Sequence, residues 1–182
     1  MVVRDISEYT GDFHHLVGIA TAEYPELPRV VLGHSMGGGI VFAYGVEHPD
    51  DYKLMVLSGP AVDARSQVGL PLALAAKVLG SILPGLPAES LPFDAVSRDP
   101  EVVAAYNADP LVYHGKVPAL SAATMLRTSG ALWPDYARWT LPTLVVHGTE
   151  DRLADVRGSQ RFVQSVASPD LTYHEVAGGF HE

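Results

Sequence analysis

Residues 29–39 read RVVLGHSMGGG, and this stretch decides the fold. The short β-branched and apolar run at 29–32 suits a buried parallel strand. The apolar residues 40–47 suit a helix, which ends near Pro49. Between the two, a serine with a glycine two residues away on either side forms the pattern G-x-S-x-G. A strand, a sharp turn and a helix are the context in which this pattern carries a nucleophilic serine.

The turn itself consists of Gly33, His34, Ser35, Met36 and Gly37. We expect a strained backbone at Ser35, which lifts its hydroxyl clear of the sheet. Side chains at positions 33 and 37 are expected to collide with the neighbouring strand and helix, which would explain both glycines. The Met36 N–H, free at the start of a helix, would point toward an oxyanion formed at the serine. The alternative interpretation is a glycine-rich turn whose serine has no chemical role.

The pattern of strands and helices continues on both sides of this turn. An amphipathic helix capped by Ser7 is predicted at 7–24. Apolar and alternating runs predict further strands at 53–57, 142–147 and 171–176. Strand, helix and strand joined by short links form a βαβ unit, so we predict an α/β fold with a parallel sheet.

The middle of the chain has a different character, because no strand is evident between Gly59 and Leu141. A Leu- and Ala-rich helix and two shorter helices are predicted at 69–87, 99–107 and 121–129. Prolines and a lysine make the first of these too interrupted to cross a membrane. We therefore divide the chain into an α/β core at 1–60, a helical cap at 61–140 and a second part of the core at 141–182.

The composition excludes several classes of protein. Of the 182 residues, 47% are hydrophobic and 18% charged, which is unlike a disordered chain. The absence of cysteine excludes disulfides and thiolate chemistry. A net charge of −9 without a basic cluster argues against nucleic acid as a partner. The first residues lack the basic-then-apolar order of a signal peptide, which leaves the cytoplasm and the cell envelope as expected locations.

A serine hydroxyl is a weak nucleophile unless a histidine base and an orienting carboxylate assist it. In folds with this turn they follow in the order serine, acid, histidine, in loops after later strands. Asp151 follows the strand predicted at 142–147, and His181 follows the strand predicted at 171–176. Both positions are at carboxyl ends of strands, where open α/β sheets build their sites. We therefore predict Ser35, Asp151 and His181 as nucleophile, acid and base.

Other acids and histidines compete for these roles. Glu150 and Asp155 lie close to Asp151, but Asp151 fits the loop after the strand better than they do. His174 competes with His181, but it falls in the middle of a predicted strand. The histidines expected to serve packing are His34 and His147, and those expected in exposed helices or loops are His14, His15, His48 and His114. None of the eight histidines has metal-ligand spacing, so we predict no metal.

Three stretches resemble bacterial monoacylglycerol lipases of the actinobacterial type, within the serine α/β-hydrolases that also include lysophospholipases. They read RVVLGHSMGGGIVFAYGV at 29–46, SRDPEVVAAYNADPLVYHGKVP at 97–118, and LVVHGTEDRL with GGFHE at 144–153 and 178–182. The resemblance implies an α/β-hydrolase fold with Ser35, Asp151 and His181 as its triad. It also implies hydrolysis of a monoacylglycerol to a fatty acid and glycerol, without a cofactor.

Members of that family begin with several further strands and end with a further helix, so the resemblance implies that N-terminal strands are missing here. One of those strands precedes a His-Gly loop that supplies the second oxyanion donor, which leaves the Met36 N–H as the donor in this chain. The Leu- and Ala-rich helix of the cap has two interpretations: it packs its apolar stripe against the rest of the cap, or it lines an acyl tunnel and makes transient contact with a lipid surface. The alternatives are an esterase or thioesterase with another acyl substrate, and an impaired fragment that at most binds lipid.

Overall fold

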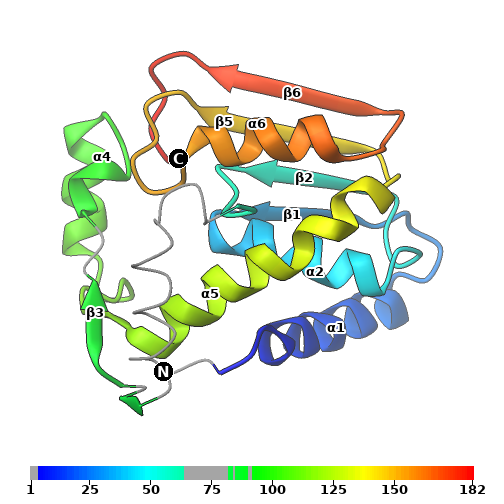
Figure 1. Cartoon of the computed structure of the whole chain (residues 1–182), viewed down its shortest axis with the longest axis horizontal. Helices are drawn as coiled ribbons and strands as arrows, with labels where there is room; N and C mark the ends of the chain where they lie inside the picture. The colour runs from blue at the N-terminus through cyan, green and yellow to red at the C-terminus, as the bar shows by residue number, and fades with distance from the viewer. Residues whose placement is uncertain (1–3, 64–81, 84, 90–91) are drawn as a thin grey trace.

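Figure 1 shows the computed structural model of the chain, which describes residues 4–63, 82–83, 85–89 and 92–182. Its centre is a four-stranded sheet in the order β1-β2-β5-β6. The strands are β1 (Val30–His34), β2 (Leu54–Ser58), β5 (Thr143–Gly148) and β6 (Leu171–Val176). All three neighbouring pairs are parallel, so the carboxyl ends of the strands meet at one edge, on the left in Figure 1. The predicted α/β fold with a parallel sheet is confirmed.

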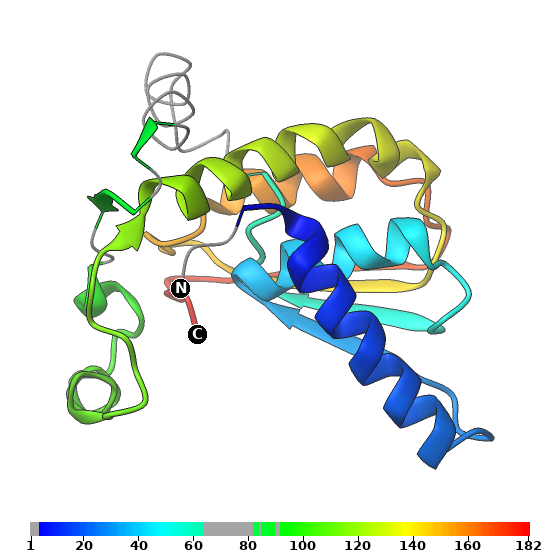
Figure 2. The same cartoon turned by 90° about the horizontal axis from the view of Figure 1, so that it is seen from below.

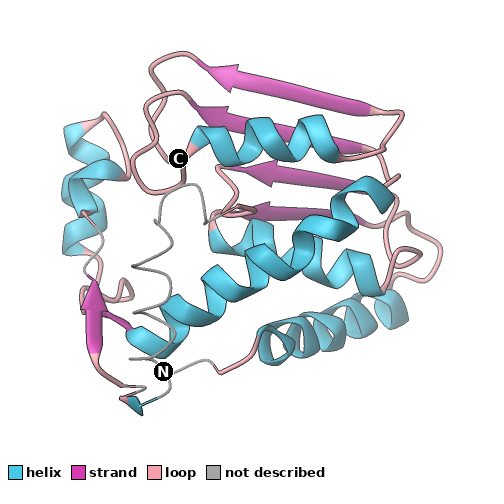
Figure 3. Cartoon of the chain, in the orientation of Figure 1, coloured by secondary structure: helices cyan, strands magenta, loops and turns pink. Residues whose placement is uncertain are grey.

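The helices lie mainly on one side of this sheet. They are α1 (Ile6–Glu23), α2 (Met36–Glu47), α4 (Pro100–Ala108), α5 (Ala119–Leu132) and α6 (Val156–Ser165), with short 3₁₀ turns at Phe93–Ala95 and Trp133–Arg138 (Figure 3). Seen from below, α2, α5 and α6 cover the same face of the sheet (Figure 2). The helices predicted at 99–107 and 121–129 correspond to α4 and α5.

The core lies between the sheet and these helices, with Phe42 of α2 at its centre. The Phe42 ring meets Tyr136 and Phe162 edge-on at centroid distances of 5.1 and 5.2 Å, and Trp139 at 5.0 Å. Such aromatic pairs bury large areas and fix the relative orientation of the elements that carry them. Tyr136 and Trp139 come from the end of the segment predicted as a cap, so this end packs into the main core.

The opposite face of the sheet is open among the described residues. Side chains alternate between the two faces of a strand, and Val31 and Gly33 of β1 face the helices. Val30 and Leu32 point the other way and are 61% and 64% exposed. β1 is the edge strand of the described sheet, and the side chains on its open face are apolar and exposed.

The start of α1 corrects the predicted cap. Asp5, not Ser7, is the N-cap residue: its carboxylate accepts a hydrogen bond of 3.0 Å from the Ser7 N–H. The Glu8 side chain in turn accepts from the Asp5 N–H at 3.2 Å, which completes a capping box. Both acids satisfy free N–H groups at the positive end of the helix.

The expectation of no strand between Gly59 and Leu141 is wrong. β3 (Pro87–Glu89) and β4 (Val117–Pro118) form a small antiparallel pair. Strands this short, with prolines at their ends, leave no alternating pattern in the sequence. The helix predicted at 69–87 lies mostly outside the described residues, and the division into core and cap stays a prediction. No helix in the described part is long and apolar enough to span a membrane.

Candidate active site

Ser35 lies in the one-residue turn between β1 and α2. Its φ of 53° and ψ of −124° are the positive-φ conformation that side chains rarely adopt. Such a conformation costs about 1–3 kcal/mol and persists where the surrounding structure holds it. The Ser35 N–H donates to the Ser58 carbonyl at 3.0 Å, and the Ala61 N–H donates to the Ser35 carbonyl at 2.9 Å. The loop after β2 therefore holds the strained serine from both sides, and the predicted strain is confirmed.

Of the two glycines predicted to be required in the turn, one is required and the other is not. A Cβ at Gly33 would lie 2.5 Å from Val41 and 2.7 Å from the Cα of Gly38, so this glycine is required, as expected. A Cβ at Gly37 would meet no atom within 4 Å, so the expected collision there is wrong. The close approach is at Gly38, where a Cβ would lie 2.5 Å from Pro60. One residue along a helix turns the side chain by about 100°, which moves it from open space to the loop after β2.

These contacts predict opposite effects of two neighbouring substitutions. Gly38→Ala is expected to destabilise the protein by about 1–3 kcal/mol, because the methyl group overlaps Pro60. Gly37→Ala is expected to be neutral or to stabilise by up to about 1 kcal/mol, because alanine is the better helix former and the space is open. Urea unfolding of both variants measures the difference. Equal destabilisation by the two substitutions would contradict the packing described for α2.

Asp151 is held in the loop that follows β5. Its Oδ1 accepts hydrogen bonds from the backbone N–H groups of Leu153 and Ala154 at 2.7 and 2.8 Å. Its side chain is fully buried, and Oδ2 lies 2.7 Å from Nδ1 of His181. The two competing acids are placed elsewhere: Glu150 is exposed, and Asp155 caps α6 by accepting from the Arg157 N–H.

His181 reaches Asp151 because the loops after β5 and β6 are joined by backbone hydrogen bonds. The Glu150 N–H donates to the Gly179 carbonyl at 2.9 Å, and the Thr149 N–H donates to the Val176 carbonyl at 3.0 Å. Gly148 must be a glycine here, since a Cβ would lie 2.2 Å from the Phe180 carbonyl oxygen. The competing His174 is exposed in the middle of β6.

The loop after β2 connects this acid–histidine pair to the serine turn. Gly59 has a positive φ of 47° and lies directly against this pair. A Cβ atom added at Gly59 would lie 3.3 Å from His181 Nδ1 and 3.4 Å from Asp151 Oδ2. Ser58 and Ala61, in the same loop as Gly59, are hydrogen-bonded to Ser35. The ring of His34, next to Ser35, lies 4.7 Å from the ring of His181. The structure thus brings Asp151 and His181 into direct contact and places Ser35 at the same edge of the sheet, linked to them through the loop after β2.

Two titratable groups at the site have shifted pKa values. Burial by itself would raise the pKa of Asp151, but hydrogen bonds from His147, His181 and the Ala154 N–H outweigh it and hold the pKa well below its usual range. Burial lowers the pKa of His34, and the nearby His181 lowers it further. Asp151 is therefore an anion at neutral pH, and it can stabilise a cation on His181.

The first N–H groups of a helix have no acceptor within it. The N–H of Met36, the first residue of α2, has no hydrogen-bond acceptor among the residues that the structure describes. The N–H of Gly38 donates to the Ser35 carbonyl at 3.0 Å. The Met36 N–H is thus available beside the serine.

His147, for which the sequence predicts a packing role, has more specific partners in the structure. It is buried, its Nδ1 lies 2.7 Å from Ser159 Oγ, and its Nε2 lies 3.1 Å from Asp151 Oδ2. His147 and Asp151 are four residues apart, but the chain between them leaves the strand β5 and forms a turn. Sequence periodicity therefore carried no signal that their side chains meet.

A second group of polar side chains lies at the opposite end of the sheet and includes His14 and His48, which the sequence predicts to be exposed. With Asp51 they form a group whose candidate metal-ligand atoms all lie within 4.8 Å of one another. The Tyr44 hydroxyl donates to Asp51, and its pKa is raised by burial and by this carboxylate. The two imidazole rings are stacked at 4.8 Å and 24°, so their in-plane lone pairs do not converge on one point.

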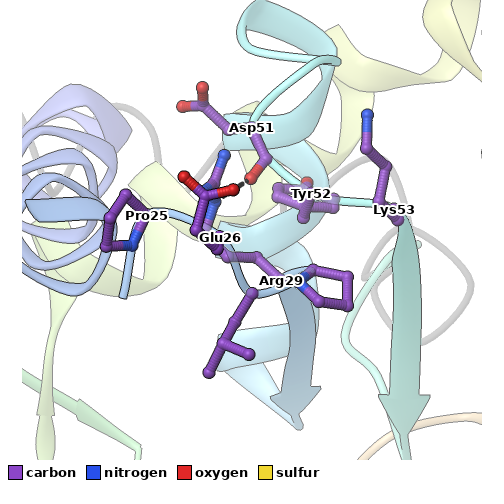
Figure 4. A pocket seen from close by; sticks show the side chains of 8 residues that line it. Pro25, Glu26, Arg29, Asp51, Tyr52 and Lys53 are labelled. Carbon is purple, nitrogen blue, oxygen red and sulfur yellow. Dashed lines mark hydrogen bonds between the residues drawn. The ribbon is translucent and has the colours of Figure 1, made fainter. Parts of the chain in front are cut away.

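A surface pocket lies at this same end, beside the start of β1 and β2 (Figure 4). Arg29 reaches across it, and its Nε donates to the Asp51 carbonyl oxygen at 2.5 Å. Because parallel strands run away from this pocket toward Ser35, it is not part of the triad site.

A parallel sheet with a strained serine between its first strand and a helix, and an acid–histidine pair at the same edge, has the architecture of the α/β-hydrolase fold. The chain belongs to the Hydrolase_4 family, described as serine aminopeptidase, S33, whose model matches residues 1–182.

Relatives and solved structures agree with this assignment. The chain is 54% identical over 180 residues to a monoacylglycerol lipase of Mycolicibacterium smegmatis, which covers 99% of the chain and 64% of that protein. It is 33% identical to a monoglyceride lipase of Rattus norvegicus, over 100% of the chain and 60% of that protein. A crystal structure of a Paleococcus ferrophilus monoacylglycerol lipase superposes with a TM-score of 0.84 at 27% identity, over 98% of this chain and 67% of that one. This chain therefore spans less than two thirds of the length of both relatives.

Proposed function

We propose that this chain is the part of a serine carboxylic-ester hydrolase that carries the triad, and that its substrate is a monoacylglycerol. One observation supports the chemistry above all: Asp151 Oδ2 lies 2.7 Å from His181 Nδ1, and the Gly59 loop joins this pair to the strained Ser35. The names of the relatives in Mycolicibacterium smegmatis and Rattus norvegicus support the substrate. So does a structure of a Saccharomyces cerevisiae monoglyceride lipase described as a complex with a substrate analogue.

In the proposed mechanism, Ser35 Oγ attacks the ester carbonyl while His181 Nε2 takes the serine proton. Asp151 holds His181 with hydrogen on Nδ1, which leaves Nε2 as the acceptor, and its negative charge stabilises the imidazolium. The Met36 N–H donates to the oxyanion of the tetrahedral intermediate. His181 then protonates the departing glycerol oxygen, which leaves an acyl ester on Ser35.

Water completes the cycle. His181 Nε2 takes a proton from a water molecule, whose oxygen attacks the acyl carbonyl. The second tetrahedral intermediate collapses when Ser35 recovers its proton from His181 and the fatty acid leaves. These steps use side chains and backbone groups of the protein alone, and they require no cofactor.

The proposed lipid substrate fits the surroundings of the site. The segment that holds α4 and β3 lies beyond the carboxyl ends of the strands, on the side where the C-terminus lies (Figure 1). Arg152, next to Asp151, forms an ion pair of 3.1 Å with Asp94 of this segment. Ile82 and Leu83, at the start of its described part, are 68% and 51% exposed, as suits transient contact with a lipid surface. The net charge of −9 argues against a nucleic acid as a partner.

The substrate proposal predicts a dependence on acyl length. The purified chain is expected to hydrolyse monoacylglycerols with a kcat/KM that rises from short to longer acyl chains, because each buried methylene contributes about 0.8 kcal/mol of binding. Soluble esters of acetate and butyrate, and a thioester of matched length, are measured in parallel. A preference for the shortest ester would exclude the lipase, and a preference for the thioester would favour a thioesterase. Binding of monoacylglycerol without turnover would identify an impaired fragment.

A further inference from the structure

His147 lies near the end of β5, four residues before Asp151, and only 1% of its surface is exposed. Its Nε2 lies 3.1 Å from Asp151 Oδ2 and 2.9 Å from the Ala154 carbonyl oxygen. Its Nδ1 lies 2.7 Å from the hydroxyl of Ser159, a completely buried residue of α6. Both ring nitrogens of His147 are therefore held by partners inside the protein.

These partners decide which nitrogen of His147 carries the proton. Carbonyl and carboxylate oxygens can only accept, so Nε2 must be the donor. In the neutral ring Nδ1 is then an acceptor, and the Ser159 hydroxyl donates to it. His147 thus has hydrogen on Nε2, whereas His181 donates from Nδ1 to the same carboxylate oxygen.

The buried Asp151 carboxylate receives three hydrogen bonds and a fourth polar contact of 3.1 Å from His147 Nε2, whose single hydrogen is shared with the Ala154 carbonyl. Two backbone N–H groups bind Oδ1, and the two histidines bind Oδ2. Donors on both oxygens fix the plane of the carboxylate and keep it ionised. A serine hydrolase needs that plane fixed, because the position of His181 Nε2 relative to the serine depends on it.

We propose that His147 is a positioning residue of the active site, whose Nε2–H orients the Asp151 carboxylate toward His181 and shares the negative charge of Oδ2. This inference rests on the proposed function, in which Asp151 orients the base. The alternative is a purely structural role, in which His147 only fills the space between β5 and α6. The positioning role requires an N–H at the place of Nε2 of residue 147. The structural role requires only a side chain with the volume of the ring.

Glutamine and asparagine separate these possibilities. In His147→Gln, the amide nitrogen of the new side chain would lie where Nε2 of histidine lies, so this variant keeps the donor to Asp151. The shorter asparagine places its amide near the level of Nδ1, so His147→Asn keeps a polar group near Ser159 and loses that donor. Neither variant retains the ring, and His174→Asn, at an exposed position of β6, is the matched control.

We expect His147→Asn to lower kcat for monoacylglycerol hydrolysis by about tenfold to a hundredfold, and His147→Gln to stay within about threefold of the unmodified protein. Without the second donor, the Asp151 carboxylate turns away from His181 and stabilises its cation less, so the acid limb of the kcat/KM profile moves to lower pH in the asparagine variant only. Equal losses in both variants, with the acid limb unmoved, would overturn the positioning role.

The other titratable groups that face His147 stay the same in all variants. Glu175, its register partner on β6, is bound by Gln160 and Tyr173. His34 faces the pair from the end of β1, and its pKa is shifted first by burial and then by His181, the Ser58 backbone, Asp151 and His147. A shift of the acid limb confined to His147→Asn therefore reports the lost donor rather than a change in these groups.

A second readout does not depend on turnover. In nitrogen NMR of the ¹⁵N-histidine-labelled chain, His147 is expected in the Nε2–H tautomer. The downfield Nδ1–H proton signal of His181 is expected to persist in His147→Gln and to be lost in His147→Asn. The Nδ1–H tautomer at His147, or an unchanged His181 signal in His147→Asn, would overturn the inference. Absence of Ser35-dependent hydrolysis, with these NMR results as expected, would instead overturn the proposed function alone.

Discussion

Replacing Ser35 by alanine is expected to lower ester hydrolysis by about 10⁴- to 10⁶-fold and to abolish labelling by a fluorophosphonate probe. The loss is large because the hydroxyl is the atom that forms the acyl-enzyme, and no neighbouring group can replace it. Hydrolysis of monoacylglycerol and in-gel fluorescence after probe labelling measure the two effects.

The alanine variant should remain folded, since the hydrogen bonds that hold Ser35 involve its backbone N–H and carbonyl rather than its side chain. Its thermal unfolding is therefore expected to match that of the unmodified protein. Ser165→Ala is a suitable control, because the Ser165 hydroxyl on α6 donates to the Arg161 carbonyl, away from the site. Probe labelling that persists in Ser35→Ala would show that another residue is the nucleophile.

Asp151→Asn is expected to lower kcat/KM by about 10⁴-fold while it preserves the shape of the site. An asparagine amide group facing His181 would donate to Nδ1 and so favour the tautomer with hydrogen on Nε2, which cannot accept the serine proton. Nε2 of His147 would face the same amide. Kinetics with monoacylglycerol, together with histidine NMR of the tautomers, tests both consequences. Glu150→Gln is the control, since Glu150 is exposed.

The same substitution is expected to change the response of stability to acid. The pKa of Asp151 is lower in the folded than in the unfolded protein, so its charge contributes stability above the ordinary carboxyl pKa of 3.8. This contribution is lost as the pH falls from there toward the folded-state pKa. Below pH 4 the free energy of unfolding should therefore fall more steeply in the unmodified protein than in Asp151→Asn. Parallel curves would contradict the hydrogen-bonded anion.

The strands and the order of the site residues could be predicted from local patterns. The strand at Leu171–Val176 has the bounds expected from the sequence, and the other three begin or end within two residues of their predicted limits. The position of Ser35 could be predicted from the strand before it, the helix after it and the glycines around it. Asp151 and His181 needed only loops after strands, because the carboxyl ends of parallel strands meet at one edge.

Contacts between distant segments could not be predicted in this way. The close approach at Gly38 depends on Pro60, which the next strand brings against α2. The proposed role of His147 depends on its contact with Ser159 and on the path of the loop after β5, which brings Asp151 into contact with His147. The grouping of His14, His48 and Asp51 depends on how α1 packs against the end of α2. Each of these involves residues with no fixed spacing in the chain.

The sequence by itself determined that this protein is a parallel α/β chain in which a serine turn, an acid and a histidine follow in the order proposed for nucleophile, acid and base. These features follow from backbone periodicity and turn chemistry, which act over a few neighbouring residues. Tertiary structure alone decided that two histidines contact the same oxygen of the buried Asp151 carboxylate. It also decided that position 38, rather than position 37, has no space for a side chain. The reason is physical: hydrogen bonds and close packing depend on distances in space, and these exist only once β1, β2, β5 and their helices are in place.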